Sequence, residues 1–409
     1  MKTEAYACIN KNDITRKLSS SGGIYPLIAE AIIRDGGRVF AACYDEELNV
    51  AHKMLCTIED IELSQGSKYV ESSLGDTFKW VLKHSSEGRT VLFAGTPCQC
   101  AGLNSLISLR NADRKNIFLM DFVCHGIPGR VPWDAFRKTV NNQGRILTGV
   151  NMRDKSSGWR NGDYSWKFTF QDGKTSVVSR RKVAYMKGML SNLYLRPSCH
   201  ECRFKGVDRC TDITVGDYWG VWGHLPDMDD NKGTSLVILH SEAGKAMFDR
   251  IKENIRFENA VLTEAVKDNP CIIESTKYNP QREIFFKRFH AGKDFTSLVE
   301  KLTNPSLMSR LSRKIRTINY KNSIKVKKEN KDSNSERTIP VLYERKASCC
   351  GCTACYEVCP KDAITMKEDD EGFLYPVIDT NKCINCCNCL KVCPVKKRTF
   401  YRETGGCFE

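Results

Sequence analysis

Two runs of cysteine near the end of the chain have a spacing that suits iron–sulfur chemistry. Each run reads C-x2-C-x2-C-x3-C-P, and the eight cysteines are Cys349, Cys352, Cys355, Cys359, Cys383, Cys386, Cys389 and Cys393. Three thiols spaced in this way on a tight loop can each bind a different iron of one 4Fe–4S cubane. Zinc sites use pairs of C-x2-C instead, so the pattern predicts two 4Fe–4S clusters and not zinc.

The two runs together resemble bacterial two-cluster ferredoxins, in which the fourth cysteine of each run binds the other cluster. Cluster 1 is therefore assigned to Cys349, Cys352, Cys355 and Cys393. Cluster 2 is assigned to Cys383, Cys386, Cys389 and Cys359. The stretch 363–379 between the runs fits a strand–turn–strand. Cys350 and Cys387 each directly follow a ligand; we expect them to be packing thiols, although a shifted register could use them.

Ten further cysteines precede this unit, at positions Cys8, Cys43, Cys56, Cys98, Cys100, Cys124, Cys199, Cys202, Cys210 and Cys271. Cys199 and Cys202 form a chelating C-x2-C pair, whereas Cys98 and Cys124 each follow an apolar run that predicts a buried strand. In a parallel sheet, the loops after such strands share one edge. The sequence therefore predicts a third cluster held by Cys98, Cys124, Cys199 and Cys202, with Cys210 as an alternative ligand.

Composition places the chain among globular proteins with reduced thiols. The 409 residues exceed one ordinary core and include 21 cysteines, and no apolar run is long enough to cross a membrane. No secretory leader is visible, so we expect a cytoplasmic protein without disulfides. Three oxidised clusters at about −2 each would lower the formal charge of +14 to about +8.

A basic stretch, residues 309–328, holds eight Lys or Arg and no acid. We interpret it as the solvated face of a linker. Docking of an acidic electron carrier is the second interpretation and nucleic acid the third, because no aromatic residues alternate with the charges in a nucleic-acid-binding motif. The overall prediction therefore includes no nucleic-acid partner.

Helix and strand patterns alternate over residues 19–136, which favours an open α/β sheet of mixed or largely parallel strands. Residues 144–192 are richer in strand signals, with a hairpin around Asp172 and Gly173, and residues 242–300 look mostly helical. The small C-terminal unit should have the α+β fold of a bacterial ferredoxin. The expected parts are two segments of one flavoprotein unit, a basic linker, the ferredoxin-like domain and a tail: residues 1–140, 141–300, 301–341, 342–398 and 399–409.

Seven motifs occur in one order between residues 16 and 260: SSSGGIY, QGSKYVES, LFAGTPCQCAGL, DFVCHGIP, RDKSSGW, CHEC and DITVGDYWG. In this order they resemble the coenzyme F420 hydrogenase/dehydrogenase beta-subunit family. The resemblance implies FAD and a 4Fe–4S cluster in this region. The family also includes plant 7-hydroxymethyl chlorophyll a reductase and a ferredoxin-dependent divinyl chlorophyllide reductase, neither of which uses the deazaflavin. The resemblance therefore supports the expected fold and FAD better than it supports any particular substrate.

The family's ferredoxin-like unit is often N-terminal, whereas in this chain it is C-terminal. The motifs also suggest flavin-binding residues, namely Ser20, Ser21, Gly22, Gly23, Lys68, Tyr69, Thr96 and Gln99. The serines and glycines open a helix and suit a pyrophosphate, although an ordinary serine cap is the plain alternative. Lys68 would place a cation, and Tyr69 an aromatic ring, near the flavin. The alternative is that both residues belong to a solvated loop. His125 is the candidate catalytic residue, as a proton donor, and a structural histidine is its alternative.

Together these features predict an oxidoreductase that passes electrons between ferredoxin-type clusters and FAD to reduce or oxidise an organic substrate. Its expected partner is ferredoxin or another low-potential carrier. An electron-transfer subunit that serves a partner enzyme is one alternative. A coenzyme F420-dependent oxidoreductase is the other.

Overall fold

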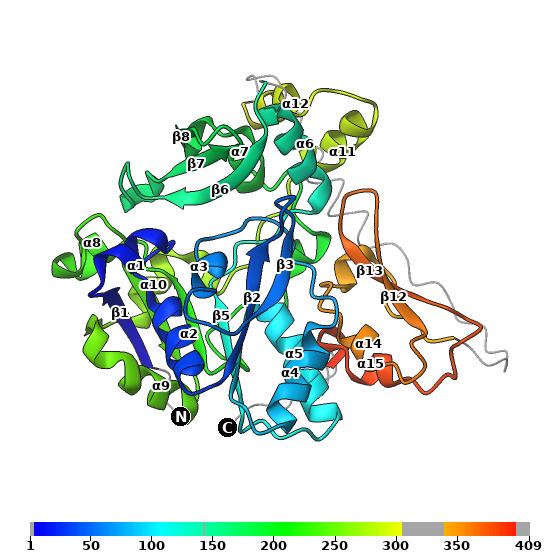
Figure 1. Cartoon of the computed structure of the whole chain (residues 1–409). Helices are drawn as coiled ribbons and strands as arrows, with labels where there is room; N and C mark the ends of the chain where they lie inside the picture. Colours follow the sequence, from blue (N-terminus) through cyan, green and yellow to red (C-terminus); the bar gives the residue numbers. More distant parts are fainter. Residues whose placement is uncertain (1–3, 142–143, 305–338, 398–409) are drawn as a thin grey trace.

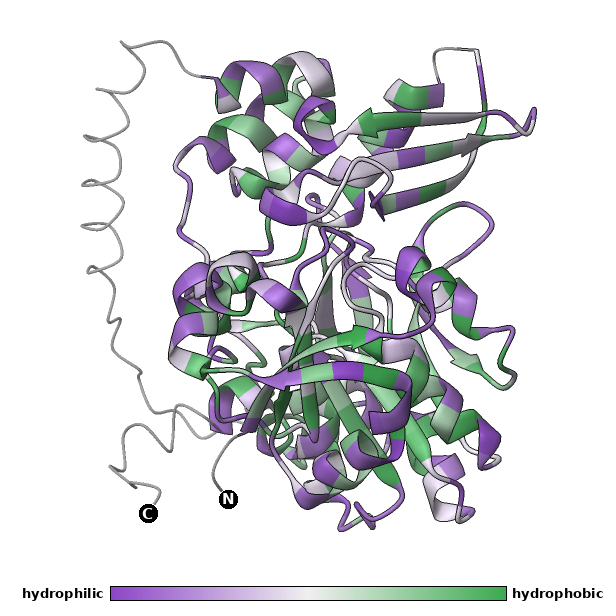
Figure 2. Cartoon of the chain, turned by 90° about the vertical axis from the view of Figure 1, so that its left-hand side faces the viewer, coloured by the Kyte–Doolittle hydropathy of each residue, from purple (hydrophilic) through white to green (hydrophobic). Residues whose placement is uncertain are grey.

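The computed structural model describes residues 4–141, 144–304 and 339–397. These residues form an eight-stranded sheet, a three-stranded sheet and a two-stranded hairpin, each packed against helices (Figure 1). Hydrophobic residues concentrate in the strands of the large sheet, whereas the outer loops are mainly hydrophilic (Figure 2). Within the described ranges, no helix combines the length and apolar character that crossing a bilayer requires.

The eight-stranded sheet has the strand order β11-β1-β10-β9-β5-β4-β2-β3. Its strands are β1 (Glu4–Asn10), β2 (Arg38–Tyr44), β3 (Val50–Leu55), β4 (Val91–Gly95), β5 (Ile117–Phe122), β9 (Ile213–Asp217), β10 (Ser235–Leu239) and β11 (Ile255–Asn259). β2, β4, β5 and β9 are parallel neighbours, and the other pairings are antiparallel. The predicted open sheet of mixed strands is therefore confirmed, and it takes strands from both sides of residue 140.

Helices cover both faces of this sheet. One face packs against α2 (Ile24–Arg34) and α9 (Glu242–Ile251), whose buried residues include Ile28 and Phe248. The other face packs against α4 (Thr77–Ser86) and α5 (Pro97–Leu109), where Phe78 and Leu103 are buried. The remaining helices of this part are α1 (Asp13–Leu18), α3 (Ile61–Ser64), α8 (Val221–His224) and α10 (Leu262–Asp268).

The step from β4 to α5 shows how the sequence brings thiols to the edge of the sheet. All five residues of β4, VLFAG, are buried, as expected for a central strand covered on both faces. Thr96 then caps α5, with Pro97 in the first turn and Gln99 completing a capping box. Cys98 consequently lies in the first turn of the helix, just beyond the carboxyl end of β4.

A second unit lies above the large sheet in Figure 1. It contains β6 (Leu147–Asp154), β7 (Ser165–Phe170), β8 (Thr175–Ser179), α6 (Arg130–Asn141), α7 (Ala184–Leu190), α11 (Gln281–His290) and α12 (Phe295–Thr303). Its core is aromatic, with Trp133, Trp166, Tyr185 and Phe285 fully buried in one cluster. The predicted hairpin is the β7–β8 pair.

The C-terminal unit is a small ferredoxin-like α+β fold. Its elements are α14 (Ala354–Glu357), β12 (Ile364–Glu368), β13 (Leu374–Ile378) and α15 (Asn388–Lys391). β12 and β13 form the strand–turn–strand expected between the two cysteine runs. The basic stretch 309–328 and the tail 399–409 lie outside the described residues.

This unit docks beside α4 and α5 of the large sheet (Figure 1). Cys352, Ala354 and Val392 share a buried cluster with Leu103 and Leu106 of α5. Ion pairs cross the same junction, between Arg282 and Glu371, Arg130 and Glu368, and Arg345 and Glu201. The two parts therefore form a packed interface with both apolar and charged contacts.

Gly102 permits the closest part of this approach. A Cβ atom at Gly102 would lie 2.8 Å from both the Cβ and the Sγ of Cys352, which is closer than side-chain atoms pack. Gly223, in α8, is a matched helical glycine, because a Cβ there would meet nothing within 4 Å. Packing therefore leaves no room for a side chain at Gly102, whereas there is room for one at Gly223.

We expect Gly102→Ala to lower the free energy of unfolding by about 1–3 kcal/mol, because the new methyl group overpacks the junction. Alanine in an open helical position is favoured by up to about 1 kcal/mol, so Gly223→Ala should be neutral or stabilising. Thermal unfolding of the anaerobic protein measures both. Equal stability of the two variants would contradict the close approach described here.

Candidate functional site

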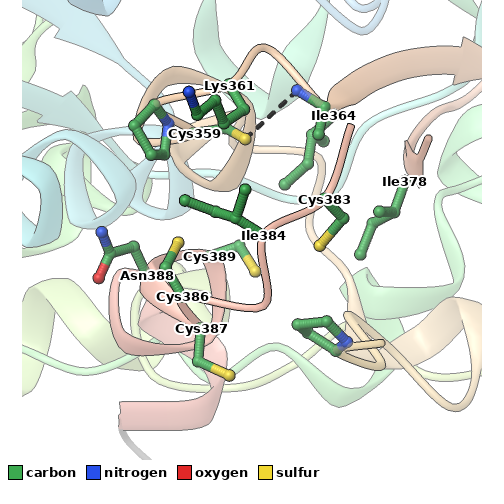
Figure 3. Close-up of a pocket in the computed structure, with 13 residues that line it drawn as sticks. Cys359, Lys361, Ile364, Ile378, Cys383, Ile384, Cys386, Cys387, Asn388 and Cys389 are labelled. Carbon is green, nitrogen blue, oxygen red and sulfur yellow. Dashed lines mark hydrogen bonds between the residues drawn. The ribbon is translucent and has the colours of Figure 1, made fainter. Parts of the chain in front are cut away.

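The cysteines predicted for cluster 2 line one small pocket (Figure 3). They are Cys359, Cys383, Cys386 and Cys389. Cys359 belongs to the first cysteine run, so the structure brings the fourth thiol of that run to the three thiols of the second. Ile364, Ile378 and Ile384 form apolar walls around the pocket. The backbone N–H of Ala363 donates to Cys359 Sγ at 3.3 Å, a contact that would stabilise a thiolate ligand.

The cysteines predicted for cluster 1 also lie near one another. Burial raises the pKa of Cys355, and the thiolates of Cys349 and Cys393 raise it further. Cys393 acts electrostatically on Cys352 as well. The set again includes one thiol from the other run, because Cys393 is the last cysteine of the second run. Thiols that repel one another's negative charge lose their protons when a cationic metal centre binds.

The predicted third site is a pocket at the carboxyl edge of the large sheet. Cys98, Cys124, Cys199 and Cys202 all line it. Cys98 comes from the start of α5, Cys124 follows β5, and Cys199 lies on the short turn Pro197–Glu201. The predicted alternative ligand Cys210 is not among the residues that line this pocket. The structure therefore brings together the first set of four.

Both pockets offer sets of four thiols. In a cubane each thiolate binds a different iron, so the four sulfurs need not converge on one point. Within the described ranges, no three His, Cys, Asp or Glu side chains converge where one metal ion could bind. Each set of four thiols has the donor chemistry that a 4Fe–4S cluster requires, and the ligand roles remain predictions.

Cations surround the third site. Its lining includes Arg196, Arg203, Lys205 and Arg209. Lys205 Nζ donates to the backbone oxygens of Cys124 and Cys271, and Arg209 pairs with Asp121 at 3.0 Å. A thiolate-bound cubane carries net negative charge, so cations beside it stabilise the reduced form and raise the reduction potential.

His125 lines the same pocket but has partners on both ring nitrogens. Its Nε2 lies 2.9 Å from Asn192 Oδ1, and its Nδ1 lies 3.4 Å from Cys271 Sγ. Burial lowers the pKa of the imidazole. These contacts orient the ring, and its proposed role as a proton donor remains a prediction.

The serine–glycine motif lies at the same edge of the sheet, because it follows β1, which runs in the direction of β9. Ser20 Oγ lies 2.8 Å from Ser67 Oγ, and Ser21 Oγ donates to Thr234 O at 2.8 Å. A Cβ on Gly22 would overlap the carbonyl oxygen of Cys8 in β1. Gly22 is therefore required by packing against the strands, and its role in binding a phosphate remains a prediction.

Gly23, the N-cap of α2, has a left-handed backbone with φ 83° and therefore turns the chain into the helix.

Lys68 and Tyr69 both form hydrogen bonds with neighbouring groups. Lys68 Nζ donates to three backbone oxygens, those of Ser64, Gln65 and Gly66. Burial lowers the pKa of Lys68 to about 8. The hydroxyl oxygen of Tyr69 accepts a hydrogen bond from Arg153 at 3.1 Å.

Thr96 and Gln99 form hydrogen bonds with each other in the capping box of α5. Gln99 Oε1 accepts from the Thr96 N–H at 2.9 Å, and Thr96 Oγ1 lies 3.1 Å from Cys98 Sγ. Their polar groups thus have local partners, and Thr96 lines the third site rather than a separate flavin pocket. Their predicted contact with the flavin ring gains no support from this arrangement.

Two basic residues that were not predicted as site residues, Arg153 and Lys155, also lie at this edge of the sheet. Arg153, 4% exposed, bonds with Asp217 and with the Ser20 carbonyl oxygen, while its Nε has no partner within the described structure. Lys155 donates to the carbonyl oxygens of Arg16 and Ser21, and burial lowers its pKa to about 7. The signal in the sequence was the motif RDKSSGW, whose basic residues lie within the predicted strand-rich stretch 144–192.

We expect Cys98→Ala to remove about four of about twelve iron atoms per chain while the signals of clusters 1 and 2 remain. Cys210→Ala should keep all the iron, because Cys210 does not line the pocket. Iron and acid-labile sulfide assays, with electron paramagnetic resonance of the reduced protein, measure this. Iron loss from the Cys210 variant alone would overturn the assignment.

Two segments of the chain match models of known families. Residues 88–265 match the family model for the C terminus of the coenzyme F420 hydrogenase/dehydrogenase beta subunit, and residues 348–397 match a 4Fe-4S dicluster domain. No curated protein matches the chain. A solved chain of the F420-reducing [NiFe] hydrogenase complex from Methanosarcina barkeri is similar, with 16% identity and a TM-score of 0.44 over 65% of this chain and 89% of that one.

Residues 88–265 are therefore similar to the coenzyme F420 hydrogenase/dehydrogenase beta-subunit family, and the chain is an iron–sulfur protein with a C-terminal 4Fe–4S dicluster domain.

Proposed function

We propose that the protein is an oxidoreductase that uses three 4Fe–4S clusters and FAD to link a one-electron carrier to an organic substrate. When bound, the clusters supply one-electron transfer and the flavin supplies the change between one-electron and two-electron steps. One observation carries the proposal: Cys98, Cys124, Cys199 and Cys202, from three distant segments of the sequence, line a single pocket beside the ferredoxin-like unit. Ala347 and Val395 of that unit line the same pocket.

The cluster 2 site is the outer end of this arrangement. Cys386 is exposed, and Ile384, which also lines the cluster 2 pocket, is 56% exposed. Lys361 lies at the same pocket and is exposed. An apolar contact beside a cation suits an acidic carrier protein such as ferredoxin, so we place the carrier's docking face here.

FAD fits the edge where Ser20, Ser21, Arg153 and Lys155 meet. Arg153 pairs with Asp217, but its buried Nε has no partner within the described structure, and the side-chain amine of Lys155 donates to backbone oxygens. A pyrophosphate would accept from both groups, and the backbone N–H groups at the start of α2 would add to its binding. This site adjoins the same sheet edge as the third cluster pocket. The chain's own contribution is to hold the cofactor there and to exclude water from it.

A second candidate function is that of a subunit that relays electrons to a partner enzyme. The matching family model is described as a beta subunit of a hydrogenase or dehydrogenase, which favours an assembly. Purified chain that reduces its flavin but turns over no substrate without a partner would support this candidate. Reduction of coenzyme F420 by the purified chain would support the deazaflavin-dependent alternative.

Anaerobic purification tests the proposal directly. We expect about twelve iron atoms, about twelve acid-labile sulfides and one FAD per chain, because each cubane holds about four of each. The flavin is extracted with acid and identified by chromatography. Eight iron atoms without flavin would contradict the proposed role of the family segment and leave only an electron-carrying ferredoxin-like unit.

FAD affinity should fall as the pH rises above about 7. In the free protein Lys155 loses its proton near this pH, whereas a bound pyrophosphate favours the charged amine and raises its pKa. Binding therefore takes up a proton, and the affinity should fall by up to about tenfold per pH unit.

Lys155→Met should abolish this slope and bind FAD weakly throughout, whereas Lys174→Met, an exposed lysine on the β7–β8 hairpin, should behave as wild type. Lys68 also titrates in this range, with a pKa of about 8, so the comparison between the two variants isolates Lys155. Fluorescence titration of the deflavinated protein measures the affinity. A slope that persists in Lys155→Met would exclude this amine as the phosphate ligand.

A further inference from the structure

A fifth thiol, Cys350, lines the third-site pocket together with the four predicted ligands. On one side, Cys350 and Cys98 are hydrogen-bonded through their side chains. On the other side, Cys350 makes a side-chain hydrogen bond with Cys352, a predicted ligand of cluster 1. Cys350 therefore lies between a predicted ligand of the third cluster and a predicted ligand of cluster 1.

The chain brings these two sites together by close backbone packing. Gly102 of α5 lies against Cys352, with no room for a side chain between them. Gly351 lies against Arg196, since a Cβ on Gly351 would be 2.8 Å from Arg196 Nη1. Arg196 also donates to the Cys349 carbonyl oxygen at 3.0 Å and lines the third-site pocket. Cys350 and Arg196 therefore form the wall that the two sites share.

The other half of the ferredoxin-like unit has no such contact among the described residues. Ile384 follows the first cysteine of the second run, as Cys350 follows the first cysteine of the first run. Ile384 lines the outer pocket and is 56% exposed. Val395, two residues after the cluster 1 ligand Cys393, lines the third-site pocket instead. The cluster 1 site, not the cluster 2 site, therefore adjoins the third site.

We propose that Cys350 is the positioning residue through which one electron crosses between the cluster 1 site and the third site. This inference rests on the proposed function, because both sites must hold clusters. The crossing breaks no bond and moves no proton: one site is oxidised by one electron and the other is reduced by one. The reductant is the low-potential carrier protein. A polarizable sulfur in contact with a ligand on each side provides a shorter connection than a methyl group would.

The test uses the anaerobic holoprotein with Cys350→Ala, the conservative Cys350→Ser and the matched variant Ile384→Ala. Each protein is mixed rapidly with a reduced bacterial ferredoxin, the carrier whose docking face we place at the cluster 2 site. Samples frozen at successive times are examined by electron paramagnetic resonance, and flavin bleaching is followed in parallel. Iron and sulfide are assayed in every preparation.

In Cys350→Ala we expect full iron content, unchanged reduction of clusters 1 and 2, and several-fold slower reduction of the third cluster. Cys350→Ser should restore much of the rate, because its hydroxyl can keep both contacts. Ile384→Ala should leave the crossing between clusters 1 and 3 at the wild-type rate. These signatures separate a role in electron crossing from a merely structural one, which would also alter the cluster spectra.

Two results would overturn the inference while leaving the proposed function standing. Loss of about four iron atoms from Cys350→Ala would make Cys350 a cluster ligand. Full iron with an unchanged rate of third-cluster reduction would show that the electron crosses elsewhere. Wild-type protein with only about eight iron atoms would instead overturn both the inference and the third cluster on which it rests.

Discussion

The buried side chain of Arg196 joins the ferredoxin-like unit to the loops beside the large sheet. Arg196 is 1% exposed and forms an ion pair with Glu71. Its guanidinium also donates to the carbonyl oxygens of Cys349 and Leu374, and it lies 4.3 Å from the Tyr375 ring centroid. A buried cation is costly unless it is paired and hydrogen-bonded, so this geometry holds only when both parts are in place. Other features of the junction depend on this contact.

Arg196 stands three residues before Cys199, so the arginine fixes the third-site loop against the loop that carries the cluster 1 ligands. The parallel strands of the large sheet supply the other side of the site, since β4 and β5 end next to Cys98 and Cys124. β1 runs in the same direction and leads to the serine–glycine turn. One edge of the sheet therefore collects the thiols and the cations that would face the flavin phosphates. This arrangement keeps the proposed cofactors close without a dedicated connecting domain.

Much of the cysteine chemistry could be predicted from sequence, because ligand spacing is a local property. The exchange of Cys359 and Cys393 between the two runs follows from that spacing, and the pocket at cluster 2 contains Cys359. The meeting of Cys98 and Cys124 followed from the rule that parallel strands end at one edge. Arg153 could not be predicted in the same way, because its partner Asp217 lies far along the chain. The position of Cys350 could not be predicted either, because it depends on how the two units dock.

Iron-edge anomalous diffraction from anaerobically grown crystals tests the central claim most directly, because it locates each cluster relative to named side chains. We expect three iron peaks: one in the pocket of Cys359 and Cys383, one beside Cys349, and one between Cys98 and Cys199. Cys350 should lie between the second and third peaks. Two peaks, or a third peak away from the edge of the large sheet, would contradict the account.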